Sequence, residues 1–251
     1  MLTSLELQEP QLQSVLGRAS PLTKLAVAIA WLIGLATLRA PGPALFLAAA
    51  ALGAGFVLGR LDSRRVLVAL GPLAIAALSI ALTTLLFAGS NGDPTLREVG
   101  RLGPFRITGP AVDAALAVAS RVLAIVSVGV VFAQTTEPTR LVDALVQQAR
   151  VSPRFAYGAL AAYQAAPQLA ADLVTLRAAR RVRGLGTMFA PRILVGLLVR
   201  ALRHADQLAL AMDARAFGTG PRTTYRPIRW RLADLAVGLG GGVVLWLALV
   251  L

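Results

Sequence analysis

The sequence has no cysteine and only one histidine among its 251 residues. The absence of cysteine excludes disulfide bonds, thiolate catalysis and cysteine-ligated metal sites. The one histidine, His204, follows Arg203 inside a helical pattern, so we interpret it as part of a polar helix face rather than as a metal ligand. Nothing in the residue inventory therefore predicts a bound metal or another cofactor.

Acidic and aromatic residues are also scarce. Twelve Asp and Glu stand against 25 Lys and Arg, which gives a net charge of +13, and aromatic residues make up 6% of the chain. The basic excess is greatest between Gln134 and Arg231, where 15 arginines accompany five acidic residues. Because aromatic residues are few and apolar runs flank this segment, we interpret it as a cytoplasmic surface beside the lipid bilayer and predict no nucleic-acid partner.

What the chain has in abundance is apolar residues. It is 57% hydrophobic, with a mean hydropathy of +0.70, which is too apolar for an ordinary soluble domain. Five apolar runs approach or exceed the roughly 17 residues that a membrane-spanning helix needs. We expect spans over residues 20–38, 44–59, 66–87, 111–133 and 232–251. The fold class is therefore an all-α integral membrane protein with about five transmembrane helices.

The distribution of arginine orients these spans. The compact segment Arg60–Arg65 belongs on the cytoplasmic side by the positive-inside rule, and the turn-rich loop Ala88–Pro110 then lies outside. This order places the N-terminus inside and the C-terminus outside.

Two residues within the spans need a physical explanation. Pro72 is expected near the start of the third span, because the first turn of a helix has amides without intrahelical partners and tolerates proline. Arg121 falls inside the fourth span, where a charge costs about 2.5–3.5 kcal/mol on insertion scales. We therefore expect Arg121 to face protein or water rather than lipid.

Residues 134–231 predict three helices that do not cross the membrane. The segment Thr135–Thr139 ends the fourth span and starts a short helix to about Arg150. A long helix then runs through Arg183, and a second covers about Pro191–Phe217. The domain prediction is a membrane region over residues 1–133, a cytoplasmic helical region over 134–231 and a last transmembrane helix over 232–251.

One alternative for the first long helix has to be weighed. Its part Phe155–Ala171 is uncharged and could cross the membrane on hydropathy alone. Four arginines would then lie outside, and the next apolar stretch, Ile193–Val199, is too short to return. We therefore place both long helices on the cytoplasmic face, partly sunk into the membrane interface.

The second long helix carries an apolar seam at helix-packing intervals of four and three residues. Its members are Leu194, Leu198, Ala201, Ala205, Leu208 and Met212. The first long helix offers a matching small-residue face with Ala156, Ala161, Ala165 and Ala170. We predict that the two helices cross in close contact through these faces. One further step from Met212 reaches Arg215, at the end of the seam.

Each long helix ends in an arginine followed closely by glycine: Arg183 precedes Gly184, and Ala214-Arg215 precede Gly218. One reading is helix termination alone, since glycine supplies a left-handed residue and a cation near the last turn gains about 0.3–1 kcal/mol. Because an arginine followed closely by glycine recurs at the ends of two neighbouring helices, we favour a pair of docking sites for partner proteins. Arginine suits it because its planar fork can make two hydrogen bonds to one carboxylate.

These residues lead to a family. The chain resembles the T component, the transmembrane energy-coupling subunit, of energy-coupling factor (ECF) vitamin and metal importers. The resemblance spans nearly the whole sequence and rests above all on SPLTKL (20–25), TTEPTRL (135–141), AMDARAFG (211–218) and PRTTY (221–225).

The resemblance implies two Ala-Arg-Gly signatures whose arginines, here Arg183 and Arg215, dock into grooves of two ABC-type ATPase subunits. This sequence has Val182 in place of the first alanine and Ala216 in place of the second glycine. We expect the departure at Ala216 to displace the turn after Arg215 toward Gly218. The resemblance further implies a multi-pass subunit of a prokaryotic cell membrane that passes ATPase motion to a membrane-embedded substrate-binding S component.

The residues themselves leave other function classes open. An intramembrane lipid- or prenyl-processing enzyme would need clustered ionisable groups at membrane depth, for which Asp113, Arg121 and Asp234 are the candidates. A membrane scaffold or insertase would use the basic helices to contact lipid or nascent chains. The sequence has no GxxxxGK[ST] phosphate-binding loop, so this chain does not bind ATP by that route and is expected to be non-catalytic.

Overall fold

The computed structural model describes residues 14–38, 40–93, 95–102, 105–185, 191–217, 224 and 226–251. These residues form two compact units. The membrane unit contains residues 14–141 and 229–251, and the arginine-rich unit contains residues 142–228. Each unit is described by itself below.

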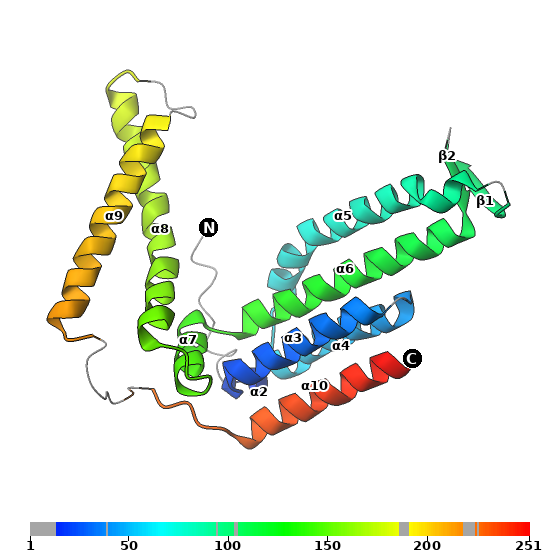
Figure 1. Ribbon diagram of the computed structural model, residues 1–251, viewed down its shortest axis with the longest axis horizontal. Coiled ribbons are helices and arrows are strands. Elements are labelled where there is room, and N and C mark those ends of the chain that lie inside the picture. The colour runs from blue at the N-terminus through cyan, green and yellow to red at the C-terminus, as the bar shows by residue number, and fades with distance from the viewer. Residues whose placement is uncertain are drawn as a thin grey trace. The chain divides into compact units, whose positions relative to one another are not determined.

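The membrane unit is a helical bundle in which helices that follow one another in the bundle run antiparallel, while the last helix runs parallel to the first apolar one (Figure 1). Its helices are α2 (Val15–Arg18), α3 (Pro21–Thr37), α4 (Pro41–Gly59), α5 (Ser63–Phe87), α6 (Gly109–Thr135) and α10 (Leu232–Val250). Four of them, α4, α5, α6 and α10, are long and apolar enough to cross a membrane, and α3 is a shorter apolar helix. The five apolar helices lie where the sequence predicted them, so the all-α membrane fold is confirmed.

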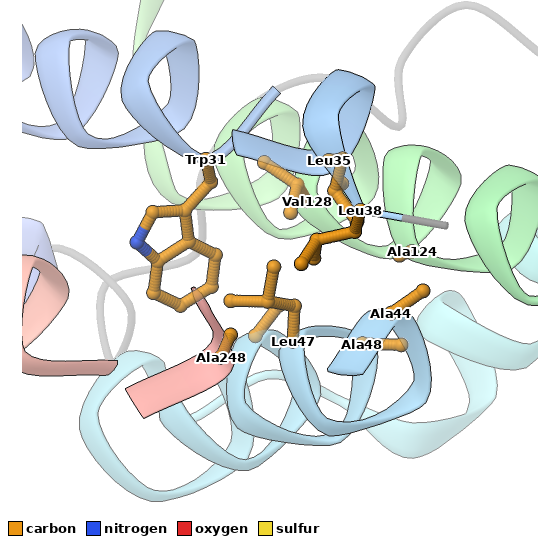
Figure 2. Close-up of a cluster of buried hydrophobic side chains, with 10 residues drawn as sticks. Trp31, Leu35, Leu38, Ala44, Leu47, Ala48, Ala124, Val128 and Ala248 are labelled. Atoms are coloured by element: carbon orange, nitrogen blue, oxygen red, sulfur yellow. The ribbon is translucent and has the colours of Figure 1, made fainter. Parts of the chain in front are cut away.

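Small residues let the helices of this bundle approach closely. Trp31 and Leu35 of α3 pack with Leu47 of α4, Val128 of α6 and Ala248 of α10 in one buried cluster (Figure 2). Gly241 of α10 has no room for a side chain, because an added Cβ would lie 2.5 Å from Cγ1 of Val27. This cluster thus packs α3, α4, α6 and α10 against one another.

Two details of the membrane unit differ from the sequence prediction. Pro72 is the tenth residue of α5 and not part of its first turn, because the Asp62 side chain caps the helix at the Arg64 N–H (3.1 Å) and starts it earlier. The loop after α5 is also more regular than expected. It contains the short helix η2 (Gly89–Gly92) and an antiparallel hairpin of β1 (Glu98–Leu102) and β2 (Phe105–Thr108).

The arginine-rich unit is built on two long helices that lie side by side over part of their length (Figure 1). They are α8 (Pro153–Val182) and α9 (Pro191–Ala214), preceded by the short α7 (Pro138–Gln147), whose first residues belong to the membrane unit. Among the helices of the described ranges, α8 and α9 do not qualify as candidate membrane spans. This agrees with the prediction that Phe155–Ala171 does not cross the membrane. The side of the membrane on which they lie stays a prediction, as does the three-region domain division.

Candidate docking site at two helix ends

The first helix end has a complete left-handed cap. Gly184 has a φ of 65°, its N–H donates to the Arg181 carbonyl (3.1 Å), and the Leu185 N–H donates to the Arg180 carbonyl (3.0 Å). This pair of bonds is the Schellman motif, with glycine in the position that needs a positive φ. Arg183 is therefore the C-cap residue of α8, and its side chain is exposed.

The second helix end repeats this geometry with a different residue. Ala216 has a φ of 52°, its N–H donates to the Asp213 carbonyl (2.8 Å), and the Phe217 N–H donates to the Met212 carbonyl (2.9 Å). Arg215 thus holds the same place relative to the turn as Arg183 does. The expected displacement of the turn toward Gly218 is wrong, because Ala216 itself takes the left-handed conformation. Gly218 lies outside the described residues.

The two exposed arginines lie at opposite ends of α9 (Figure 1). Arg183 ends α8 beside the start of α9, where Leu176 lies 3.7 Å from a Cβ built on Gly196, and Arg215 follows the last residue of α9. A helix of 24 residues rises roughly 36 Å. Val182 is 89% exposed, so valine in place of the signature alanine meets no packing constraint there.

An aromatic contact supports the second end. The ring of Phe217 meets the ring of Tyr157 of α8 edge to face, with centroids 6.2 Å apart. The Tyr157 hydroxyl donates to Asp143 Oδ1 of α7 at 2.7 Å. Burial, and then the hydrogen bond to the Asp143 carboxylate, raises the pKa of Tyr157 to about 12, so the hydroxyl keeps its proton at neutral pH. Sequence reasoning missed this contact because its three residues are far apart and follow no common period.

The contact between α8 and α9 differs from the predicted seam. It runs through Ile193, which is 7% exposed, Gly196 beside Leu176, and an ion pair of Arg200 with Asp172 (3.2 Å). Leu194 and Leu198 are 65% and 59% exposed, and Ala205 and Leu208 are exposed as well, while Ala201 and Met212 are half-buried. The face of α9 that packs on α8 is therefore the neighbouring one, which carries Gly196 and Arg200.

The predicted seam is consequently an exposed surface. We call the exposed residues of the seam, together with the neighbouring Leu202, the α9 apolar face: Leu194, Leu198, Leu202, Ala205 and Leu208. Three exposed leucines in adjacent turns form a contiguous apolar patch, and such patches on proteins mark contacts with partners or membranes.

The intramembrane charges have protein partners. The Arg121 guanidinium of α6 donates to the carbonyl of Leu38, the C-cap of α3, which confirms that it faces protein. Asp234 is buried and accepts hydrogen bonds from the N–H groups of Ser20 (2.5 Å) and Arg231 (2.8 Å). Asp113 is exposed near the start of α6, whereas the residue at the other end of α6, Thr135, is the one bonded to Lys24. The three candidates for intramembrane catalysis are thus not brought together.

No group of three or more His, Cys, Asp or Glu residues that could hold a metal ion occurs in the described ranges. The lone His204 is exposed on α9.

Comparisons with known proteins found both a matching family and individual relatives. The model of the CbiQ family, described as cobalt transport protein, matches residues 13–225. The energy-coupling factor transporter transmembrane protein EcfT of Limosilactobacillus fermentum is 28% identical over 239 residues, covering 88% of this chain and 87% of its own. The EcfT of Thermotoga maritima is 46% identical over 54 residues, which are 21% of this chain and 20% of that one.

A third relative is an ATP-binding protein by name. A putative ABC transporter ATP-binding protein of Bifidobacterium longum is 31% identical over 196 residues, 70% of this chain. The chain spans only 24% of the length of that relative. The chain therefore belongs to the CbiQ family and is the transmembrane T component of an energy-coupling factor transporter, a multi-pass protein of the prokaryotic cell membrane.

Proposed function

We propose that this T component binds two ABC-type ATPase subunits through Arg183 and Arg215 and passes their motion to a membrane-embedded substrate-binding S component. The observation that carries the proposal is the repeated geometry of the two helix ends: an exposed arginine at the C-cap, followed by a left-handed residue. The same cap at the ends of two helices suits two copies of one partner.

The chemistry of the docking follows from arginine. Each guanidinium offers a planar set of N–H donors that matches a carboxylate, so a groove with an acidic residue on the ATPase is the expected acceptor. The proposal requires the arginine-rich unit to lie on the cytoplasmic side, where the arginine asymmetry of the sequence also places it. The chain itself does no chemistry, and its partners hydrolyse ATP.

Charge reversal at the two arginines tests the docking. Loss of one partner of a buried charged pair typically costs about 2–5 kcal/mol of binding. Arg183→Glu or Arg215→Glu alone should therefore reduce the ATPase that co-purifies with the full chain, and the double variant should lose it together with ATP-driven uptake. Normal ATPase recovery with the double variant would contradict the assignment.

The matched controls are Arg177→Glu and Arg203→Glu, which reverse exposed charges on the same helices. Arg200 is unsuitable as a control, because a carboxylate there would face Asp172. If the control variants lose as much co-purifying ATPase, the losses result from general surface charge and not from docking of Arg183 and Arg215.

The α9 apolar face is the proposed contact for the S component. A membrane-embedded partner presents apolar surface at the membrane interface, and burying a leucine side chain is worth about 1.5–3 kcal/mol. Because Leu198 is 59% exposed, Leu198→Gln should leave the α8–α9 contact intact.

We expect Leu198→Gln to lower substrate uptake and S-component recovery while ATPase recovery stays normal. Leu210→Gln is the control, since Leu210 is 69% exposed on α9 but lies roughly a third of a turn away from Leu198 around the helix. The proposal fails if the two variants behave alike.

A further inference from the structure

The membrane unit contains a cavity that neither the helix ends nor the α9 apolar face involves. Its volume is about 250 Å³, and α3, α4, α6 and α10 supply most of its walls. The lining is almost entirely apolar and includes Trp31, Ala51, Val128, Gly240 and Val244. The apolar walls offer water few of the polar partners that it needs.

One end of the cavity is polar. Lys24, the only lysine in the sequence, lines it together with Thr135. Lys24 is 6% exposed, and its Nζ donates to the Thr135 carbonyl at 2.6 Å. An ammonium group has three N–H donors, and within the part of the chain that the structure describes this is the one hydrogen bond of Nζ.

The nearest acidic side chain does not accept the remaining N–H groups of Lys24. Asp234 also lies at this end of the bundle, but its Oδ1 accepts from the Ser20 N–H and its Oδ2 from the Arg231 N–H. Arg140, whose Nη1 donates to the Gly17 carbonyl at 2.7 Å, adds a second cation to the field at Lys24. The polar end therefore has two basic side chains and N–H donor capacity that a negative oxygen would use.

The cavity also reaches the outer surface of the bundle. Leu58 of α4, which is 39% exposed, and the exposed Gly240 of α10 both belong to its lining. In a protein that spans a membrane, the surface at these positions meets lipid. Lys24 stands at the start of α3, the depth of the cytoplasmic headgroups in the predicted topology, and Trp31 lies seven residues further, roughly 10 Å deeper.

We propose that this cavity binds one acyl chain of an anionic phospholipid, with the headgroup phosphate held by Lys24. The apolar walls match a hydrocarbon chain, and the cationic end matches a phosphate that carries net negative charge. The site is independent of the ATPase-docking arginines, since it lies wholly within the membrane unit.

Trp31 provides a built-in probe for the occupant. It lines the cavity and is 7% exposed, with its Nε1 held by the Gly241 carbonyl at 2.9 Å, so bulk lipid has little access to the ring. The other tryptophans, Trp230 and Trp246, are 66% and 63% exposed and are removed as Trp230→Phe and Trp246→Phe. The full chain with this single tryptophan is reconstituted in vesicles that contain phosphatidylglycerol with mid-chain bromine atoms, which quench tryptophan at short range.

The expected result is strong quenching of Trp31, which Gly240→Leu abolishes by filling the cavity. Gly242→Leu is the matched control. A Cβ at either glycine meets nothing within 4 Å, so neither substitution strains the bundle, but only Gly240 lines the cavity. Absence of quenching, or equal quenching in the two glycine variants, overturns the proposal.

The headgroup part of the proposal has its own test. Brominated phosphatidylglycerol should quench Trp31 more strongly than brominated phosphatidylcholine at the same mole fraction. Lys24→Gln, which keeps an N–H donor for Thr135 but no charge, should remove this difference, and Lys24→Arg should keep it. Equal quenching by the two lipids in the Lys24 protein overturns the assignment of an anionic lipid.

Discussion

At the scale of single residues, the two docking arginines depend on the residue that follows each of them. Gly184 and Ala216 both have positive φ values, 65° and 52°. Glycine adopts this conformation without steric cost, whereas alanine pays roughly 1–2 kcal/mol for it. At the second helix end, Ala216 therefore has a backbone conformation that alanine by itself disfavours.

The first prediction follows from that asymmetry. Ala216→Gly should stabilise the last turn of α9 by about 1 kcal/mol, which corresponds to roughly fivefold slower hydrogen exchange of its amides. Gly184→Ala should do the opposite at α8, although its added Cβ meets nothing within 4 Å. Exchange measured by mass spectrometry on the purified chain checks both. Unchanged exchange in both variants would mean that the left-handed turns do not govern these ends.

The sequence predicted the surroundings of some single residues and gave no sign of those of others. Arg121 was expected to face protein because lipid makes an unpaired charge costly, and the Leu38 carbonyl is the partner found. The pairing of Lys24 with Thr135, 111 residues away, follows no period that a sequence displays. The turn at Ala216 was missed because alanine gives no signal for a positive φ.

At the scale of elements, proline positions and hydropathy predicted where the helices begin and end. They did not predict which face of a helix packs on its neighbour. The spans and both long helices were predicted to within a few residues, since apolar length and proline positions determine where helices run. Which face of α9 meets α8 was predicted incorrectly. Spacing shows that an apolar seam exists, whereas its partner is decided by local fit, here Gly196 against Leu176 and Arg200 with Asp172.

The second helix end depends on three elements, and this gives a prediction at their scale. Phe217→Ala removes the ring contact with Tyr157, a type of contact worth about 0.5–1.5 kcal/mol, and should loosen the presentation of Arg215. In an Arg183→Glu background, where Arg215 alone holds the ATPase, Phe217→Ala should lower ATPase recovery further. In an Arg215→Glu background it should change nothing. Equal losses in both backgrounds would show a general effect on folding.

Tyr157→Phe separates the ring from the hydroxyl. It keeps the aromatic contact with Phe217 and removes only the hydrogen bond to Asp143, so its effect on ATPase recovery should be smaller than that of Phe217→Ala. The hydroxyl stays protonated well above neutral pH, since its pKa is raised to about 12. The docking should therefore not depend on pH between 6 and 9 through this residue.

At the scale of the whole molecule, one unit contains the candidate membrane spans and the other contains the proposed docking residues. In the membrane unit, Arg121 has a protein partner in the Leu38 carbonyl, and Asp234 has one in the Ser20 N–H. The arginine-rich unit leaves Arg183, Arg215 and the α9 apolar face exposed. This division of labour suits a subunit that works by contact with partners rather than by chemistry of its own.

Counting ATPase subunits on the purified transporter tests this account most directly. Native mass spectrometry of the complex should find two ATPase subunits per T component in the unaltered protein and one after either Arg183→Glu or Arg215→Glu. None should remain in the double variant, while the T component stays folded in the membrane. A complex that keeps both ATPase subunits when both arginines are reversed would contradict the account.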